Sequence, residues 1–99
     1  MKLQIHSIRF DADVKLLDFI QKKADKLDTF FERIIDGEVM LRLDNDTQNE
    51  NKIVEIKLNI PGHQLFAKEK SKSFEAAADS AIEALRKQLT KYKEKNFVY

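Results

Sequence analysis

Apolar and polar residues alternate in four short stretches of the chain, which is the pattern of β-strands that bury one face. The clearest stretch is residues 54–60, where every second residue is Val, Ile or Leu. The pattern predicts strands at residues 2–8, 38–44, 54–60 and 64–70. Pro61 and Gly62 predict a tight turn between the last two strands. The polar run 45–51 is expected to form the other hairpin loop.

A helical period follows the first strand. Apolar residues three or four positions apart predict one buried stripe, made of Leu16, Leu17, Ile20, Ala24, Leu27, Phe31 and Ile34. Asp11 or Asp13 can cap the start, because a short carboxylate accepts the unpaired N–H groups of the first turn. Gly37 follows the stripe and is expected to end the helix.

The second helical period is longer and closes the chain. Its stripe consists of Phe74, Ala77, Ala78, Ala81, Ile82, Leu85, Leu89 and Tyr92. Ser71 or Ser73 is expected to cap the start. About 22 residues in this helix would span roughly 33 Å.

The predicted order is therefore β-α-β-β-β-α, an α+β fold of two layers. Each helix has one apolar stripe, so both are expected to pack on one face of a four-stranded sheet, as in double-stranded-RNA-binding domains. The other sheet face is half polar. With 99 residues, the chain is expected to be a single domain, 1–99.

Composition argues against catalysis. The chain has no Cys, two Gly and two His, and neither His6 nor His63 has a carboxylate or second His at ligand spacing. We expect His63 simply to be solvated in the turn. No enzymatic activity, cofactor, metal or small-molecule substrate is expected. The N-terminal stretch lacks the unbroken apolar run of a signal peptide or membrane span, so a cytoplasmic protein is expected.

Charge is unevenly distributed although the net charge is only +1. Residues 1–50 carry 8 basic and 11 acidic side chains, whereas residues 51–99 carry 10 basic and 6 acidic ones. Residues 86–95 alone hold five basic side chains and one acidic. A local field of this kind can attract an anionic partner despite a near-neutral total.

The helical period places many of these basic residues away from the core. In the last helix Lys87 and Lys91 point outward, Arg86 and Lys93 lie on one flank, and Lys95 lies near the other. Amines on a rigid surface suit phosphate oxygens, which require charge but little directional precision.

The first helix repeats this arrangement. Lys15, Lys22 and Lys26 share one outward ridge, and Lys23 lies nearer the apolar stripe. Because both helices are expected on one side of the sheet, their ridges would together form a basic surface.

A solvated helix surface is the competing interpretation. The last helix begins with Glu75, Asp79 and Glu83 and ends basic, which its macrodipole favours without any ligand. Asp18 and Asp25 also border the ridge of the first helix. Five basic residues in ten nevertheless exceed what a helix end needs, and their repulsion favours a shared anion.

Three segments resemble one known family. They are AIEALRKQLTKYKEK at residues 81–95, IQKKADKLDTFF at 20–31 and VEIKLNIPGHQLFAKEK at 54–70. Together with the element order, they resemble the ribosome hibernation-promoting factors, also called ribosome-associated inhibitors or sigma-54 modulation proteins. The resemblance covers essentially the whole chain and is closest to the short promoting form.

The resemblance implies a function. Family members accumulate when growth slows, bind the small ribosomal subunit where messenger and transfer RNA would lie, and contact ribosomal RNA through both helices. Carried over by position, the implied contacts are Lys23, Lys26, Lys87, Lys91 and Lys95. Neighbouring candidates from the helical period are Lys22, Arg86 and Lys93, and weaker ones are Lys68, Lys70 and Lys72.

Other interpretations remain open at this point. The chain can be a generic double-stranded-RNA-binding module, or a small regulatory or dimerisation domain that uses its open sheet face. The resemblance favours a free monomer that blocks the decoding channel. It leaves open whether the protein also promotes ribosome pairing.

Overall fold

The structure is a computed structural model that describes residues 1–45 and 50–97. In chain order its elements are β1 (Lys2–Ser7), α1 (Val14–Phe30), β2 (Asp36–Leu43), β3 (Lys52–Ile60), β4 (His63–Ser71) and α2 (Phe74–Phe97). The predicted order β-α-β-β-β-α and the α+β class are confirmed. Residues 46–49 of the predicted hairpin loop lie outside the described residues.

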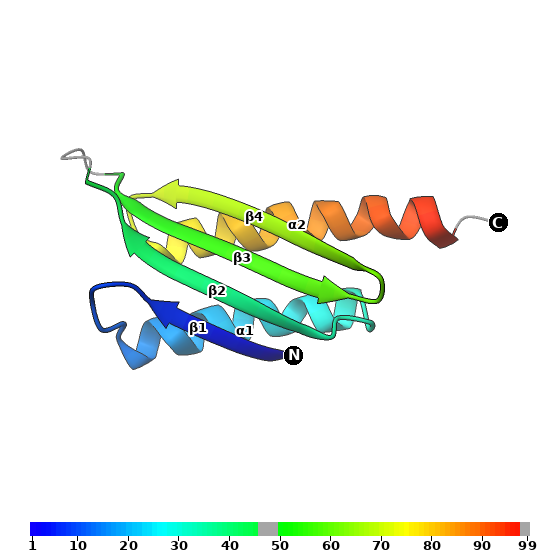
Figure 1. The fold of residues 1–99 in the computed structure, drawn as a ribbon, viewed down its shortest axis with the longest axis horizontal. Helices are drawn as coiled ribbons and strands as arrows, with labels where there is room; N and C mark the ends of the chain where they lie inside the picture. Colours follow the sequence, from blue (N-terminus) through cyan, green and yellow to red (C-terminus); the bar gives the residue numbers. More distant parts are fainter. Residues whose placement is uncertain (46–49, 98–99) are drawn as a thin grey trace.

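The four strands form one mixed sheet in the order β1-β2-β3-β4. β1 and β2 are parallel and the other pairs are antiparallel. A parallel pair needs a long crossover connection, and α1 supplies it. Both helices cover the same face of the sheet, α1 behind β1 and β2 and α2 behind β3 and β4 (Figure 1).

The core lies between the sheet and the helices. One row of side chains that crosses the sheet toward the helices is Ile5, Val39, Ile56 and Ala67. Helix α2 contributes Leu85 and Leu89, which are fully buried, and three buried alanines that let it approach the strands closely. The alternate strand residues face the open side of the sheet and are mostly polar.

Two predicted helix caps are confirmed. Asp13 accepts a hydrogen bond from the backbone N–H of Lys15 at 2.9 Å, and Ser73 Oγ accepts one from the N–H of Ala76 at 3.0 Å. Gly62 has a φ of +73° in the turn between β3 and β4, a conformation that residues with a Cβ rarely adopt. The turn prediction at Pro61 and Gly62 is therefore confirmed as well.

The predicted end of the first helix is wrong. Helix α1 stops at Phe30, and Phe31 has an extended backbone whose N–H bonds to the carbonyl of Leu27 at 2.7 Å. Gly37 lies inside β2, opposite Leu3 and Leu58, rather than at a helix end. A Cβ at Gly37 would come within 2.8 Å of Leu3 Cδ1, so the glycine makes room for core side chains.

The buried stripe of α1 also differs in detail. Leu17 was expected to be buried but is half-exposed, and Phe19 and Phe30 pack against the core at the edge of the helix. None of the helices within the described ranges combines the length and hydropathy that a bilayer crossing requires.

Candidate nucleic-acid interface

The two helices run side by side in the same direction, with their C-terminal ends toward the same end of the molecule (Figure 1). This arrangement places all eight predicted contact residues on the helical side of the sheet. They are Lys22, Lys23 and Lys26 on α1, and Arg86, Lys87, Lys91, Lys93 and Lys95 on α2. Their surroundings separate them into three groups.

The first group lies in the seam between the helices and is held by internal partners. Lys23 Nζ lies 3.1 Å from Asp79 Oδ1 on α2 and 5.6 Å from the ring centroid of Phe19. Lys93 Nζ donates to the carbonyl of Phe30 at 3.2 Å and lies 4.7 Å from the centre of its ring. Both lysines therefore form polar contacts between α1 and α2.

Arg86 belongs to the same group. Its Nε and Nη2 donate to the two carboxylate oxygens of Glu83 at 3.1 and 2.6 Å, and its guanidinium lies 5.9 Å from the centre of the Phe30 ring. These hydrogen bonds, which Arg86 donates and Glu83 accepts, lower the pKa of Glu83 and raise the pKa of Arg86. This guanidinium is already engaged in a bidentate pair, the geometry that a phosphate would also use.

The second group points outward. Lys22, Lys26 and Lys87 are exposed, as the helical period predicted. Lys87 borders a surface hollow that also contains Glu69, Asp79 and Glu83. The outer surface of α2 is thus basic toward its C-terminal end but acidic toward its start.

The third group faces the edge of the sheet at β4. Lys91 and Lys95 line a hollow of about 480 Å³ together with the turn residues Gly62 and His63 and the ring of Tyr92. His63 was expected to be merely solvated; it is exposed, but its ring also stacks on Tyr92 at 5.9 Å between centroids and 18° between planes.

The weaker candidates do not join this surface. Lys68 and Lys70 alternate with the buried residues of β4 and so lie on the open sheet face, where Lys70 Nζ is 2.9 Å from Asp44 Oδ2. Lys72 follows β4 and is exposed.

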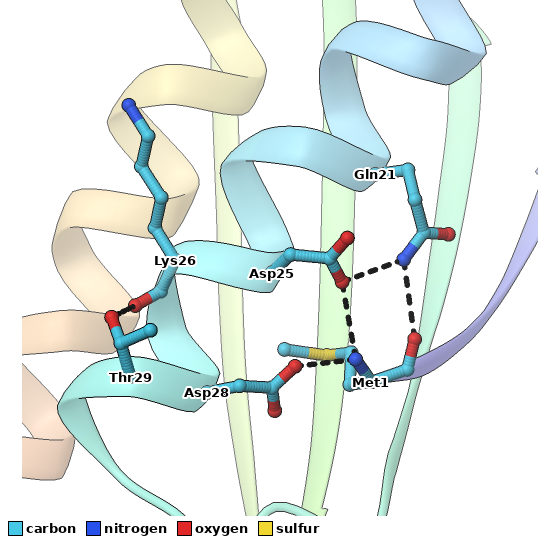
Figure 2. Close-up of polar contacts among 6 residues, drawn as sticks. All are labelled: Met1, Gln21, Asp25, Lys26, Asp28 and Thr29. Carbon is cyan, nitrogen blue, oxygen red and sulfur yellow. Dashed lines mark hydrogen bonds and ion pairs between the residues drawn. The ribbon is translucent and has the colours of Figure 1, made fainter.

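Acidic residues on α1 hold the chain's N-terminus (Figure 2). The Met1 ammonium donates to Asp25 Oδ1 at 3.1 Å and also to Asp28, while Gln21 Nε2 donates to Asp25 Oδ1 and to the Met1 carbonyl. The hydrogen bond from Gln21, followed by that from the ammonium, lowers the pKa of Asp25. The side-chain hydrogen bonds to Asp28 and Asp25 raise the pKa of the Met1 amine. Asp25, which was expected to dilute the α1 ridge, therefore shares one ammonium with Asp28, so a single positive charge faces two carboxylates here.

Within residues 1–45 and 50–97, no group of three His, Asp or Glu side chains is arranged to hold a metal ion. His6 Nε2 lies 3.2 Å from Glu38 Oε2 on the open sheet face, and both side chains are exposed. Sequence spacing did not indicate this pair, because 32 residues separate its members and strand pairing brings them together.

The sequence analysis missed two aromatic residues that contact the candidate basic residues or line the same hollow as them. Arg86 and Lys93 both contact the ring of Phe30. The only local indication that Phe30 lies near the core edge was its position next to the apolar Phe31. His63 acquires a role in the hollow only through Tyr92, 29 residues later, so no local pattern indicated it.

Comparison with known proteins gives a consistent answer. Residues 3–96 match the family described as sigma 54 modulation protein / S30EA ribosomal protein. The ribosome hibernation promoting factor of Klebsiella oxytoca is 32% identical over 95 residues, with 96% of each chain covered.

Two solved structures share the fold. A ribosomal subunit interface protein from Coxiella burnetii has a TM-score of 0.83, with 94% of this chain and 98% of that chain covered at 22% identity. The N-terminal domain of Protein Y from Thermus thermophilus has a TM-score of 0.80, with 93% and 99% covered, also at 22% identity.

Proposed function

This chain belongs to the sigma 54 modulation protein / S30EA ribosomal protein family, and from that premise we propose that it is a ribosome hibernation factor. The family consists of ribosome-binding proteins and not enzymes. The name of the Klebsiella relative, which matches along almost its whole length, supports the same function for this chain. The protein would act in the cytoplasm, as one folded unit and without a cofactor.

The observation that carries the proposal is the set of exposed lysines on the two helices. Lys22 and Lys26 on α1 and Lys87, Lys91 and Lys95 on α2 are all exposed. The two helices that bear them are parallel and packed together, so the amines are presented on a rigid support. Such a support suits an RNA surface whose phosphates have fixed positions.

The mechanism that we propose is occlusion. The preformed domain would occupy the decoding channel of the small subunit, with its helical side against ribosomal RNA, and exclude messenger and transfer RNA. No covalent chemistry is needed, because a bound protein and a tRNA cannot occupy the same volume. Recognition would depend on RNA shape and phosphate position.

The seam residues would add a second set of contacts. Lys23 and Arg86 are paired with Asp79 and Glu83 in the free protein. A phosphate that approaches either cation would compete with a carboxylate, so the net gain from these contacts is smaller than from the exposed lysines.

Co-sedimentation of the purified protein with small ribosomal subunits tests the proposal. We expect binding that weakens as salt rises, because each neutralised phosphate releases counterions. The control ligand is a blunt-ended RNA duplex that carries no ribosomal proteins. The purified protein should bind this duplex much more weakly than it binds the small subunit.

Each other result has a definite meaning. Equal affinity for the duplex would favour a generic double-stranded-RNA-binding module. A stable homodimer without affinity for subunits or RNA would favour a regulatory domain that uses its open sheet face. Either result would overturn the hibernation function.

A further inference from the structure

The hollow beside the β3–β4 turn differs chemically from the rest of the helical side. The described residues that line it include two amines and an imidazole but no carboxylate. They are Gly62, His63, Leu65, Gln88, Lys91, Tyr92 and Lys95. The hollow beside Lys87, in contrast, includes Glu69, Asp79 and Glu83, and the one beside Lys93 includes Glu32. An anion would therefore meet less repulsion from carboxylates in the hollow beside the turn than in the hollows beside Lys87 and Lys93.

The aromatic part of this hollow is held in place before any ligand binds. Tyr92 lies between two rings: Phe31 meets it edge-on at 5.9 Å and 79°, and His63 stacks on it at 5.9 Å and 18°. Phe31 is buried and His63 is exposed, so the imidazole forms the outer layer of the stack. An exposed flat ring supported from behind is a ready surface for another planar group.

The polar groups around the ring stack are placed to serve a ligand. Lys91 and Lys95 are one helical turn apart on the same flank of α2, and neither forms an ion pair with any other described residue. Gln88 donates its Nε2 to the backbone carbonyl of Phe66 at 2.8 Å, which fixes the amide and leaves its oxygen as an acceptor. Buried Leu65 supplies an apolar floor.

From this combination we infer that the hollow binds one unpaired nucleotide of a single-stranded RNA segment. The base stacks on the outer face of His63, and the adjoining phosphates lie against Lys91 and Lys95. The inference rests on the proposed ribosomal RNA binding and adds a subsite to it, at the edge of the helical side.

The ligand class follows from the mixture of groups. A free phosphate would use the amines but would leave the ring stack and the apolar floor without a partner. A duplex would offer phosphates, but its bases are stacked inside the helix and cannot reach a protein ring. A flipped-out or single-stranded nucleotide supplies both a planar base and charged phosphates, and a volume of about 480 Å³ suits a ligand of that size.

Nuclear magnetic resonance of isotope-labelled protein tests the inference directly. The probe is a six-residue adenosine RNA, compared with inorganic phosphate and with a blunt RNA duplex. We expect the hexamer to shift the ring signals of His63 and Tyr92 and the amide signal of Gly62 in a saturable way. Phosphate and duplex should leave the ring signals in place. Unmoved rings with the hexamer, or equal movement with phosphate, would overturn the inference.

Variants separate stacking from charge. His63→Ala should weaken hexamer binding roughly fivefold or more, because one stacked base contributes about 1–3 kcal/mol. Gln64→Ala is the matched control, because Gln64 is the next residue, is exposed and lies on the open sheet face. Lys91→Ala should also weaken binding, with Lys57→Ala on the open sheet face as its control. Hexamer binding by His63→Ala equal to that of the Gln64 control would contradict a stacking role.

The same variants distinguish this subsite from the proposed function. If His63→Ala binds the hexamer normally while wild-type protein still sediments with small subunits, the subsite is wrong and the hibernation function stands. If the wild-type protein binds neither the hexamer nor the subunits, both inferences fail. A selective loss of hexamer binding in His63→Ala, with subunit binding retained in part, supports both.

Discussion

At the scale of single residues, the basic side chains on the helices differ in what already holds them. Lys23 is paired with Asp79, and Arg86 is paired with Glu83, whereas Lys91 makes no ion pair with the described residues. A cation that must leave one carboxylate to meet a phosphate gains less than a cation that was only hydrated. Affinity should therefore depend on the acidic partners as well as on the lysines.

The substitution Asp79→Asn tests this dependence. It removes the partner of Lys23 and one negative charge from the helical side, so binding to small subunits should tighten roughly two- to fivefold at low salt. Glu50→Gln removes the same charge from an exposed position outside both helices and is the control. Weaker binding by Asp79→Asn would show that the ion pair positions Lys23 productively instead of competing for it.

The N-terminal ion pairs predict how stability changes with pH. The lowered pKa of Asp25 makes its contribution complete above about pH 4, and that contribution is lost as the pH falls through the folded-state pKa. The raised pKa of the Met1 amine makes its contribution complete below about pH 8, and it is lost as the pH rises through the folded-state pKa. The stabilisation by these groups should thus be largest between about pH 4 and about pH 8. Even in that range it should amount to less than about 1 kcal/mol.

Urea unfolding of wild-type protein and Asp25→Asn across this pH range measures the effect, because Asp25 has the lowered pKa and is also one of the two carboxylates that raise the pKa of the Met1 amine. The free energy difference between them should be largest near neutrality and should shrink in both acid and alkali. Asp11→Asn, another exposed aspartate close to α1, serves as the control and should show no such maximum. A difference that is constant with pH would contradict the assignment.

At the scale of elements, the boundary between α1 and β2 is decided by packing and not by a terminating glycine. The apolar residues at 31 and 34 continue the spacing of the helix, yet the chain leaves it at Phe30. Phe31 is buried in an extended conformation, and Ile34 packs against the core from the connection. β2 runs parallel to β1, and α1 connects the end of β1 to the start of β2. The chain must therefore leave the helix here and reverse direction to enter β2.

Gly37→Ala tests the close packing at the start of β2. The added methyl would meet the side chains of Leu3 and Leu58 at 2.8 and 3.0 Å, so the core has to shift. We expect a loss of about 1–2 kcal/mol in the free energy of unfolding, measured in urea. Glu38→Ala, the next residue and on the open sheet face, should change it by less than about 0.5 kcal/mol. An unchanged stability for Gly37→Ala would mean that both leucines rotate away at no cost.

At the scale of the whole molecule, the protein presents two different faces. The helical side carries exposed lysines from both helices, whereas on the open sheet face basic and acidic residues are interleaved, as in the pair Arg42 and Glu55 at 2.8 Å. A polyanion would be attracted to the helical side more strongly than to the open face, although the total charge is only +1.

Charge-reversed pairs on the two faces test this asymmetry. Lys87→Glu with Lys91→Glu should weaken subunit binding about tenfold or more and reduce the slope of affinity against salt. Lys57→Glu with Lys68→Glu changes the net charge equally on the open sheet face and should have a much smaller effect. Thermal unfolding establishes that both double variants are folded. Equal losses for the two pairs would contradict the assignment of the helical side.

Local spacing was sufficient for much of the fold. The type and order of all six elements, the caps Asp13 and Ser73, and the turn at Gly62 follow from residues within a few positions of one another. The outward direction of Lys22, Lys26 and Lys87 follows from the same short-range geometry. Backbone conformation depends mainly on neighbouring residues, so the sequence by itself determined these features.

Only the tertiary structure decided which distant residues meet. The end of α1, the packing of Gly37 against Leu3 and Leu58, and the pairing of Lys23 with Asp79 all join segments far apart in the chain. The hollow formed by His63 and Tyr92 has the same origin. Such contacts depend on strand register and helix packing, which bring together residues that no local period relates. The sequence therefore determined the exposed basic residues, and the tertiary structure decided which of them are already paired and which are available to a ligand.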